Sequence, residues 1–188
     1  FMKLTPNRFD KEFDESSEKP GEQRLEKMVS GRYMGELFSM ALAELFGEKG
    51  KNYAFTAIDI SSILMDDSVD GDRIIAIIKD KTGNEIDSED AKKVRELATT
   101  IVVRSARIVT ATYVGIIWQR AGRSKINKQH IAVDGSVYEK MPLVKENINK
   151  ALSELLGEEA AQVDTILDTG GSGLGAAISA AMAANHES

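Results

Sequence analysis

The sequence predicts a helix-rich α/β fold, and three observations lead to this prediction. Two short apolar runs, His130–Val133 and Val163–Leu167, are each followed by a glycine-containing turn and then by a helical pattern. Strand, turn and helix in succession are typical of an α/β layer, so we expect these runs to be neighbouring strands of one sheet in a three-layer lobe. The third observation is an apolar periodicity over residues 87–122, which predicts one long central helix.

Length, composition and charge narrow the class of protein. With 188 residues, 42% of them hydrophobic, the chain is long enough to bury about 70% of its unfolded surface around one core. It has no cysteine, which excludes a disulfide scaffold and thiolate chemistry. Its 24 basic residues are outnumbered by 30 acidic ones, so nucleic acid is not an expected partner. The two histidines, His130 and His186, lack metal-ligand spacing, and we predict no metal ligands in this chain.

The sequence gives no reason to expect a membrane partner. The longest apolar run, Ile101–Trp118, is interrupted by Arg104 and Arg107, whereas a span needs about 20 apolar residues in a row. The N-terminus does not read as a signal peptide. Because the chain begins Phe1-Met2, we expect either a residue fused ahead of Met2 or a piece cut from a longer chain.

The first quarter divides into a lead-in and a helix. Residues 1–20 are polar and acidic, and we expect them to pack poorly. Residues 21–47 then carry a single apolar stripe at helical spacing, which predicts one helix that stops at Gly47. Gly31 and Gly35 lie on one face of this helix. Because glycine costs a helix about 1 kcal/mol relative to alanine, the pair either marks a close approach by another backbone or a ligand, or is merely tolerated.

Three more helices are predicted before the first strand. Residues 59–66 and 72–81 read as two brief helices, the second capped by Asp70 or Asp72 and ended by Gly83. Residues 87–122 form the long helix, which Asp87 or Ser88 can cap and which Gly122 ends.

The last third, residues 128–188, contains the two strand–turn–helix units. A helix from Pro142 to Leu156 follows the first strand, and a small-residue helix over Gly175–Ala184 follows the second. The turn Gly170-Gly171-Ser172-Gly173 could direct free backbone N–H groups at a phosphate, or could serve tight packing between strand and helix. It lacks the spacing of a Walker loop, a dinucleotide fingerprint or a nucleophile elbow. The turn Asp134-Gly135-Ser136 leaves the same two interpretations open.

Several of these segments together resemble the eukaryotic-type hexokinases. Residues 20–37, PGEQRLEKMVSGRYMGEL, look like the family's sugar-binding helix segment, and Arg104-Ser105-Ala106 fits the same family. Residues 131–140, IAVDGSVYEK, resemble its adenosine motif, and residues 171–177, GSGLGAA, resemble its second connecting motif. The matches follow the family order from about residue 9 to residue 185.

The resemblance implies a fold and an activity. The fold is the actin-like, ribonuclease H-like ATPase fold, of which residues 1–188 would be the C-terminal part of the large lobe. The complete chain would transfer the γ-phosphoryl group of ATP, bound with Mg, to the 6-hydroxyl of a hexose such as glucose, in the cytoplasm, as the first step of glycolysis. The segments that carry the general-base Asp and the main phosphate motifs are not matched. We therefore predict no catalytic residue in this chain and no activity from it alone. The alternative is a catalytically inactive, hexokinase-like module that binds sugar or nucleotide.

The resemblance also implies site residues. Glu26, which periodicity alone would make a solvated helix residue, matches the family's second sugar-binding Glu. Matches to nucleotide-binding positions fall at Gly135 and Ser136, at Gly171, Ser172 and Gly173, at Arg32 and at Thr56. Arg32 stands where the family often has Lys or Met, Thr56 lies in a loosely similar stretch, and Leu174 replaces the usual Lys or Arg.

Overall fold

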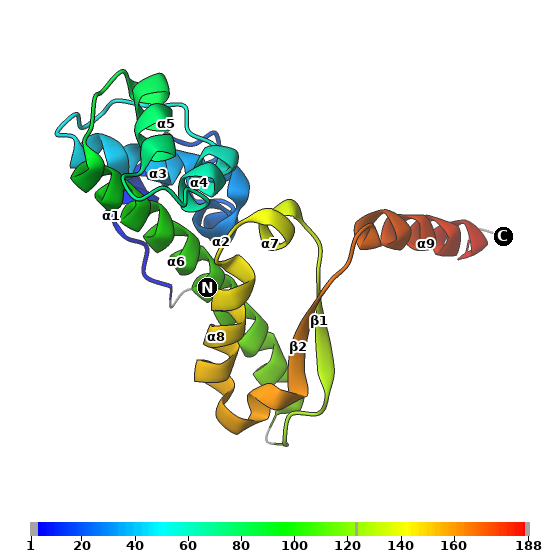
Figure 1. The fold of residues 1–188 in the computed structure, drawn as a ribbon. Coiled ribbons are helices and arrows are strands. Elements are labelled where there is room, and N and C mark those ends of the chain that lie inside the picture. The colour runs from blue at the N-terminus through cyan, green and yellow to red at the C-terminus, as the bar shows by residue number, and fades with distance from the viewer. Residues whose placement is uncertain (1–3, 123, 187–188) are drawn as a thin grey trace.

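The computed structural model describes residues 4–122 and 124–186 (Figure 1). Their elements follow the chain in this order: α1 (Arg8–Ser16), α2 (Arg24–Val29), α3 (Gly31–Leu45), α4 (Ala57–Leu64), α5 (Asp72–Thr82), α6 (Ser88–Ala121), β1 (Gln129–Val133), α7 (Ser136–Lys140), α8 (Val144–Leu156), the 3₁₀ helix η1 (Gly157–Gln162), β2 (Val163–Leu167) and α9 (Gly171–His186).

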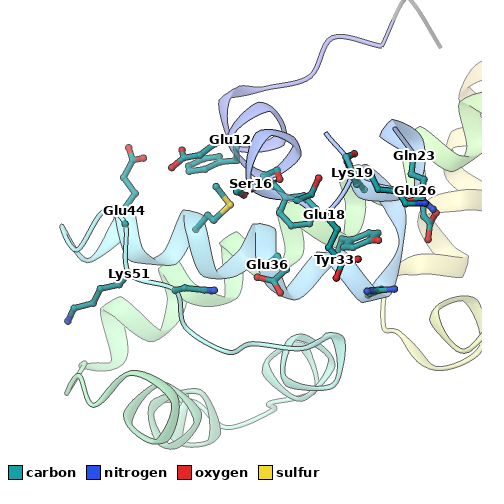
Figure 2. Close-up of a pocket in the computed structure, with 18 of the residues that line it drawn as sticks. Glu12, Ser16, Glu18, Lys19, Gln23, Glu26, Tyr33, Glu36, Glu44 and Lys51 are labelled. Carbon is teal, nitrogen blue, oxygen red and sulfur yellow. Dashed lines mark hydrogen bonds between the residues drawn. The ribbon is translucent and has the colours of Figure 1, made fainter. Parts of the chain in front are cut away.

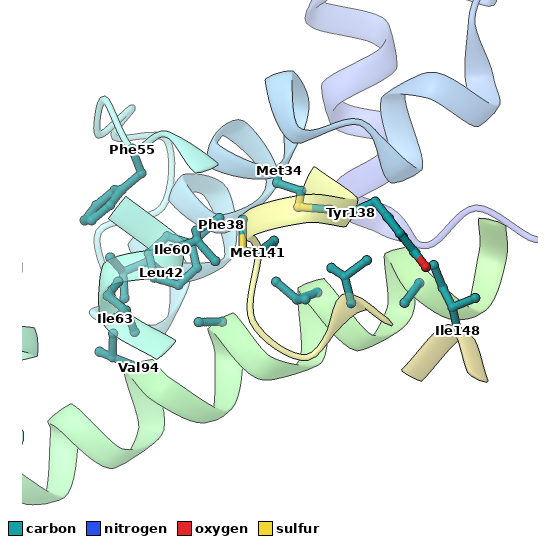
Figure 3. Packing of buried hydrophobic residues seen from close by; sticks show 14 of the residues in the cluster. Met34, Phe38, Leu42, Phe55, Ile60, Ile63, Val94, Tyr138, Met141 and Ile148 are labelled. Carbon is teal, nitrogen blue, oxygen red and sulfur yellow. The ribbon is translucent and has the colours of Figure 1, made fainter. Parts of the chain in front are cut away.

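The long helix α6 is the axis of the fold, as its periodicity predicts. Asp87 is its N-cap and accepts hydrogen bonds from the backbone N–H groups of Glu89 and Asp90, while Gly122 ends it at a φ of +61°. Helices α2, α3, α4 and α5 pack against its first part and α8 against its second (Figure 1). The core lies along α6 (Figure 3), where Phe38 and Ile60 meet Val94 in one buried cluster. Burial of apolar surface in this cluster is the main stabilising term of the fold.

The expectation that residues 1–20 pack poorly is wrong. Residues 8–16 form α1, whose N-cap Asn7 and third residue Asp10 make a reciprocal capping box. Phe13 is buried and lies 5.3 Å from the ring of Tyr33, centroid to centroid. Asp10 is also buried, and Arg104 of α6 donates to its Oδ2 at 2.6 Å. A long-range ion pair therefore fixes α1, which periodicity within a polar segment does not reveal.

The single helix predicted for residues 21–47 is two helices. The chain is extended at Ser30, with φ −71° and ψ 139°, so α2 ends there and α3 begins. The Ser30 hydroxyl accepts from the backbone N–H of Arg32, which caps α3. The apolar stripe continues through Ser30 without a break, so the spacing did not predict that this serine caps a new helix. The end of the helix near Gly47, at a φ of +70°, agrees with the prediction.

The two brief helices are present, with one difference in capping. Helix α5 ends at Gly83 as predicted, but its N-cap is Gly71 rather than an aspartate. A glycine N-cap has no side chain that could accept a hydrogen bond from the first turn of the helix. Oδ2 of Asp66 takes this role and accepts from the backbone N–H of Ile74 at 3.1 Å.

Strands β1 and β2 are neighbours in one sheet, as predicted, and they pair in parallel with Ile131 opposite Thr165. Helix α8 lies to one side of the strands (Figure 1), and on β2 the side chains of Ile166 and Leu167 remain 47% and 38% exposed. The three layers we expected are therefore not complete in the described residues. The sequence reading also missed α7, a single short helix between β1 and α8.

Helix α9 begins four residues earlier than predicted and extends away from the other elements (Figure 1).

Among the described residues, α6 is the one helix that by length and composition could cross a membrane. Its packing against the other helices favours a core role instead, and two arginines in its apolar half pair with Asp10 and Glu154.

Candidate functional site

One pocket lies between α1, α3 and the loop over residues 49–52 (Figure 2). We call it the α1/α3 pocket; its volume is about 730 Å³, and its lining includes Gln23, Glu26, Arg32, Glu36 and Glu44. Carboxylates predominate among its labelled side chains, with Glu26 and Gln23 close together at one end (Figure 2). Carboxylates accept hydrogen bonds from the hydroxyl groups of a ligand, and an amide both accepts and donates them.

Glu26 has the exposure that a binding group needs. It lies on α2 with an exposed side chain, and no hydrogen bond to its carboxylate is made within residues 4–122 and 124–186. Both oxygens are therefore free to accept hydrogen bonds from a ligand. This agrees with the prediction for Glu26 but does not test it.

Gln23 is a pocket residue that the sequence reading did not select. Its backbone has a φ of +52°, in the left-handed region that residues other than glycine seldom adopt, and it is the N-cap of α2 without a side-chain capping bond. Backbone strain of this kind gathers at functional sites. Its place within residues 20–37, the segment that resembles the family's sugar-binding segment, was the signal in the sequence.

A second pocket, the α3/β1 pocket, brings together four of the predicted nucleotide-binding residues. Its volume is about 700 Å³, and Arg32, Thr56, Gly135 and Ser136 all line it. These residues come from three separate parts of the chain. Its walls are otherwise largely apolar, and Ile58, whose side chain is 77% exposed, lies in the same lining.

Gly31 and Gly35 of α3 allow the segment before α4 and helix α7 to lie against α3. A Cβ at Gly35 would lie 2.0 Å from the carbonyl oxygen of Phe55, so α3 and the strand-like segment before α4 can touch only without a side chain there. A Cβ at Gly31 would lie 2.5 Å from Cγ2 of Val137 in α7. Of the two interpretations of this glycine pair, close backbone approach is confirmed at Gly35, and Gly31 admits a side chain of α7.

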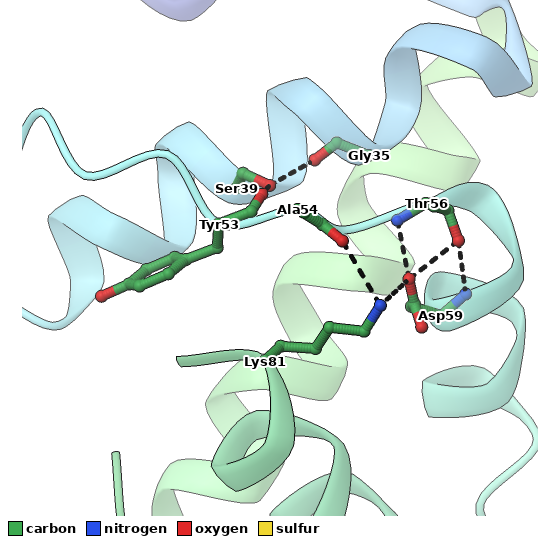
Figure 4. A network of polar contacts seen from close by, with 7 residues as sticks. All are labelled: Gly35, Ser39, Tyr53, Ala54, Thr56, Asp59 and Lys81. Carbon is green, nitrogen blue, oxygen red and sulfur yellow. Dashed lines mark hydrogen bonds and ion pairs between the residues drawn. The ribbon is translucent and has the colours of Figure 1, made fainter. Parts of the chain in front are cut away.

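Thr56 lines the pocket and also caps α4. Its Oγ1 lies 2.8 Å from Oδ2 of Asp59, and its backbone N–H donates to the same oxygen at 2.8 Å (Figure 4). Lys81 pairs with that carboxylate at 3.1 Å and also reaches the carbonyl of Ala54. Burial acts to raise the pKa of Asp59, but the hydrogen bonds from Thr56 and Lys81 outweigh it and lower the pKa. Asp59 is therefore the ionised partner of Thr56 in a capping box, and it fixes the Thr56 backbone beside the pocket.

Gly135 and Ser136 follow β1 at the mouth of the same pocket. Gly135 has a φ of +136°, a conformation open to glycine, and a Cβ there would meet no atom within 4 Å. A larger residue at 135 would thus strain the backbone whether or not a ligand binds. Tyr138 holds α7 against the sheet, because its hydroxyl donates to Oγ1 of Thr165 at 2.7 Å.

Of the third predicted group, Gly171, Ser172 and Gly173, the two glycines do not line either pocket. Both turns do leave the same end of the sheet, since the backbone N–H of Asp168 donates to the carbonyl of Val133 at 3.0 Å. Helix α9 then runs outward (Figure 1). A Cβ at Gly171 would lie 2.1 Å from Oδ2 of Asp168, whereas one at Gly173 would meet nothing within 4 Å. The side chain of Ser172 lies outside the described part of the structure.

The two pockets adjoin along α3, because Arg32 and Glu36 line both of them. The Arg32 guanidinium lies 5.3 Å from the ring centroid of Tyr33. Within the described residues, no three His, Cys, Asp or Glu side chains form a group that could hold a metal ion.

Comparisons with known proteins give one answer. The sequence model described as hexokinase matches residues 2–182. The chain is 34% identical to hexokinase-2 of Candida albicans over 194 residues, and 33% identical to the chloroplastic hexokinase-2 of Nicotiana tabacum over 196 residues. Each alignment covers 95% of this chain but 39% of the relative, so the chain spans about two fifths of their length.

Solved structures with a similar fold are also hexokinases. The solved structure of a hexokinase from Schistosoma mansoni, complexed with glucose, superposes with a TM-score of 0.71 over 87% of this chain and 38% of that one. At 24% sequence identity the likeness shows the fold alone, and it agrees with the predicted actin-like ATPase fold. From the family match over residues 2–182 and these relatives, we conclude that the chain belongs to the hexokinase family.

Proposed function

We propose that this chain is the C-terminal part of the large lobe of an ATP-dependent hexokinase. In this proposal the α1/α3 pocket contributes Glu26 to the binding of a hexose, and the α3/β1 pocket binds the adenine nucleotide. The observation that carries the proposal is that Arg32 and Glu36 line both pockets. Transfer of a group between two ligands requires adjoining sites, because the reacting atoms must come within about 3–3.5 Å.

The residues present fit the two ligands differently. Largely apolar walls that include Val109 and Tyr113 suit a planar base, and the Arg32 guanidinium is a cation at the rim suited to phosphate. For Mg, the described residues offer no group of three His, Cys, Asp or Glu side chains that could hold the ion. In the proposal the ion is therefore held by the phosphates and by residues other than these, and it would neutralise charge on the transferring group.

The proposed reaction assigns only binding and orientation to this chain. A hexose hydroxyl oxygen forms a bond to the γ-phosphorus, the bond from that phosphorus to the β,γ-bridging oxygen breaks, and the hydroxyl proton passes to a base. By the family resemblance, that base lies in a segment that this chain does not match. Glu26 accepts hydrogen bonds from the hexose hydroxyls. Arg32 orients phosphate oxygens.

Kinetics of two variants of the complete protein test the proposal. We expect Glu26→Gln to lower kcat/KM for hexose about ten- to a hundredfold, since a hydrogen bond to a charged acceptor is worth about 1.5–3 kcal/mol. The KM for ATP should stay unchanged. We expect Ser136→Phe to have the converse effect, raising the KM for ATP while the KM for hexose stays unchanged. Ser153→Phe, on an exposed face of α8, is the matched control for bulk.

The proposal is wrong if Glu26→Gln leaves kcat/KM for hexose unchanged and Ser136→Phe leaves the KM for ATP unchanged. The 188-residue chain by itself should give no turnover above the buffer blank in a coupled assay, because a base and a phosphate cradle are both needed. Turnover by this chain alone would overturn our assignment of its residues to binding only.

A second candidate is an inactive hexokinase-like module that binds sugar or nucleotide. Leu174 favours it, since this apolar residue stands where the family usually has a cation, and its side chain is 65% exposed. The same assay separates the two. Hexose and nucleotide binding by the complete protein without any turnover would support the inactive module.

A further inference from the structure

Lys27, the residue after Glu26, is buried. Its side chain is 5% exposed, and its ammonium group donates to Oδ1 of Asp14 at 2.5 Å and to the carbonyl oxygen of Lys19 at 2.7 Å. An unpaired ammonium group at such a position would be costly, so the two acceptors must stay in place. Lys27 therefore ties α2 to α1 and to the loop between them.

Asp14 holds the other end of the same loop. Its second oxygen, Oδ2, accepts from the backbone N–H of Gly21 at 2.9 Å. The hydrogen bonds from Lys27 and from Gly21 lower the pKa of Asp14, so the carboxylate stays ionised at neutral pH. One ion pair thus fixes the path of residues 17–23, which includes the positive-φ residues Gly21 and Gln23.

The far end of α2 is held as well. The Ser105 hydroxyl of α6 donates to the carbonyl oxygen of Val29, the last residue of α2, at 2.8 Å. A helix of six residues is not stable by itself. The direction of Glu26 therefore depends on these attachments rather than on the helix alone.

We propose that Lys27 is a positioning residue for hexose binding, which acts through Glu26. Its side chain is part of the lining of the α1/α3 pocket, but its ammonium group donates to Asp14 and Lys19, so the role that we assign to it is to hold α2 rather than to bind the hexose. It holds α2 at the angle at which the Glu26 carboxylate and Gln23 face the α1/α3 pocket. This inference rests on the proposed function of that pocket.

The first test is a kinetic comparison in the complete protein. Lys27→Met keeps the unbranched side chain as far as Cε and removes the ammonium group with its charge. We expect kcat/KM for hexose to fall about ten- to a hundredfold, the range associated with misplacing a binding group by about 1 Å, while the KM for ATP changes less than twofold. Lys27→Arg should recover part of the loss because it keeps the cation. Lys93→Met removes an exposed ammonium group that pairs with Asp90 on α6, and it should change neither constant.

A double-mutant cycle separates positioning from a general loss of stability. If Lys27 acts through Glu26, Lys27→Met should have little further effect on hexose kinetics once Glu26→Gln is present. Full additivity of the two losses, or unchanged hexose kinetics in Lys27→Met, would overturn the positioning role. Unchanged hexose kinetics in Glu26→Gln alone would instead contradict the proposed function of the pocket.

Asp14→Asn keeps the test decisive if Lys27→Met does not fold. The amide oxygen can still accept from Gly21, but the charge that pairs with Lys27 is lost. Melting curves identify the folded variants, and we expect the same non-additivity with Glu26→Gln. An additive loss in this cycle would count against the proposal in the same way.

Discussion

The helices around α3 and the segment from β1 to α9 leave very different surfaces. In α3 the side chains of Met34, Phe38 and Leu42 are at most 1% exposed, because α1, α4 and α6 cover them. In β2 and α9, by contrast, Ile166 and Leu174 are 47% and 65% exposed. A two-stranded sheet has too few strands to be stable without packing on one face. The difference teaches that α3 is packed on several sides by other helices, whereas β2 packs against α8 and η1 and keeps exposed apolar side chains.

The largest expected effect breaks the core of the first region. Phe38→Ala should lower the free energy of unfolding by about 3–5 kcal/mol, since it removes a fully buried ring and leaves a cavity. Leu174→Ala in α9 should change it by less than about 0.5 kcal/mol, because that side chain is mostly exposed. Urea unfolding of both variants measures the contrast. Equal losses would show that α9 is as well packed as α3.

The second effect concerns how α1 is attached. Arg104→Met should destabilise the protein by about 3 kcal/mol, because the Asp10 side chain is 5% exposed and would lose its cation. Arg107→Met is the matched control on the same helix. Its ion pair with Glu154 is 48% and 41% exposed, so its loss should cost at most about 0.5 kcal/mol. Thermal melts of the two variants compare them, and equal shifts would mean that α1 is not held through Asp10.

A smaller contrast distinguishes the glycines of the two regions. Gly35→Ala should cost about 1–3 kcal/mol and displace Thr56, because the added Cβ would overlap the carbonyl of Phe55. Gly173→Ala, in the helical backbone of α9 with open space around it, should instead stabilise by up to about 1 kcal/mol. Chemical denaturation measures the change in the free energy of unfolding for both variants, a loss for the first and a gain for the second. A neutral Gly35→Ala would mean that the segment before α4 can shift without cost.

The smallest effect is a pH dependence of stability that arises from Glu48, just after α3. Hydrogen bonds from Lys51, Tyr53 and Asn84 lower the pKa of Glu48 from 4.5 to about 2. A lowered folded-state pKa contributes stability that is present above pH 4.5 and is lost as the pH falls toward 2. Glu48→Gln should therefore be slightly less stable at pH 7 and depend less on pH between these values. Melting temperatures at pH 7, 4 and 2.5 would check this, and parallel curves for the two proteins would contradict it.

The sequence predicted local structure well where the signal itself is local. Asp87 caps α6, and Gly83 and Gly122 end their helices. The two strands pair as expected from the succession of strand, turn and helix in each unit. It predicted less well where a distant partner decides. Asp10 and Phe13 looked like part of a polar segment until Arg104 and Tyr33 came beside them.

The candidate site divides in the same way. Motif resemblance selected Glu26, Arg32, Thr56, Gly135 and Ser136, and the structure places all of them in two adjoining pockets without testing their roles. It also selected Gly171 and Gly173, which lie outside both pockets. Gln23 was missed, because its backbone conformation depends on how Asp14 and Lys27 fix the loop before α2.

By itself, the sequence determined the family through its motifs. It also determined the α/β class, the long helix and the two strands, because caps, glycines and apolar spacing act over a few residues. Only the tertiary structure decided that the helix predicted for residues 21–47 breaks at Ser30, that α1 belongs to the core region, and that Arg32 is shared by both pockets. These features depend on ion pairs and close contacts between residues far apart in the chain. Their free energy appears only when the distant partner is in place.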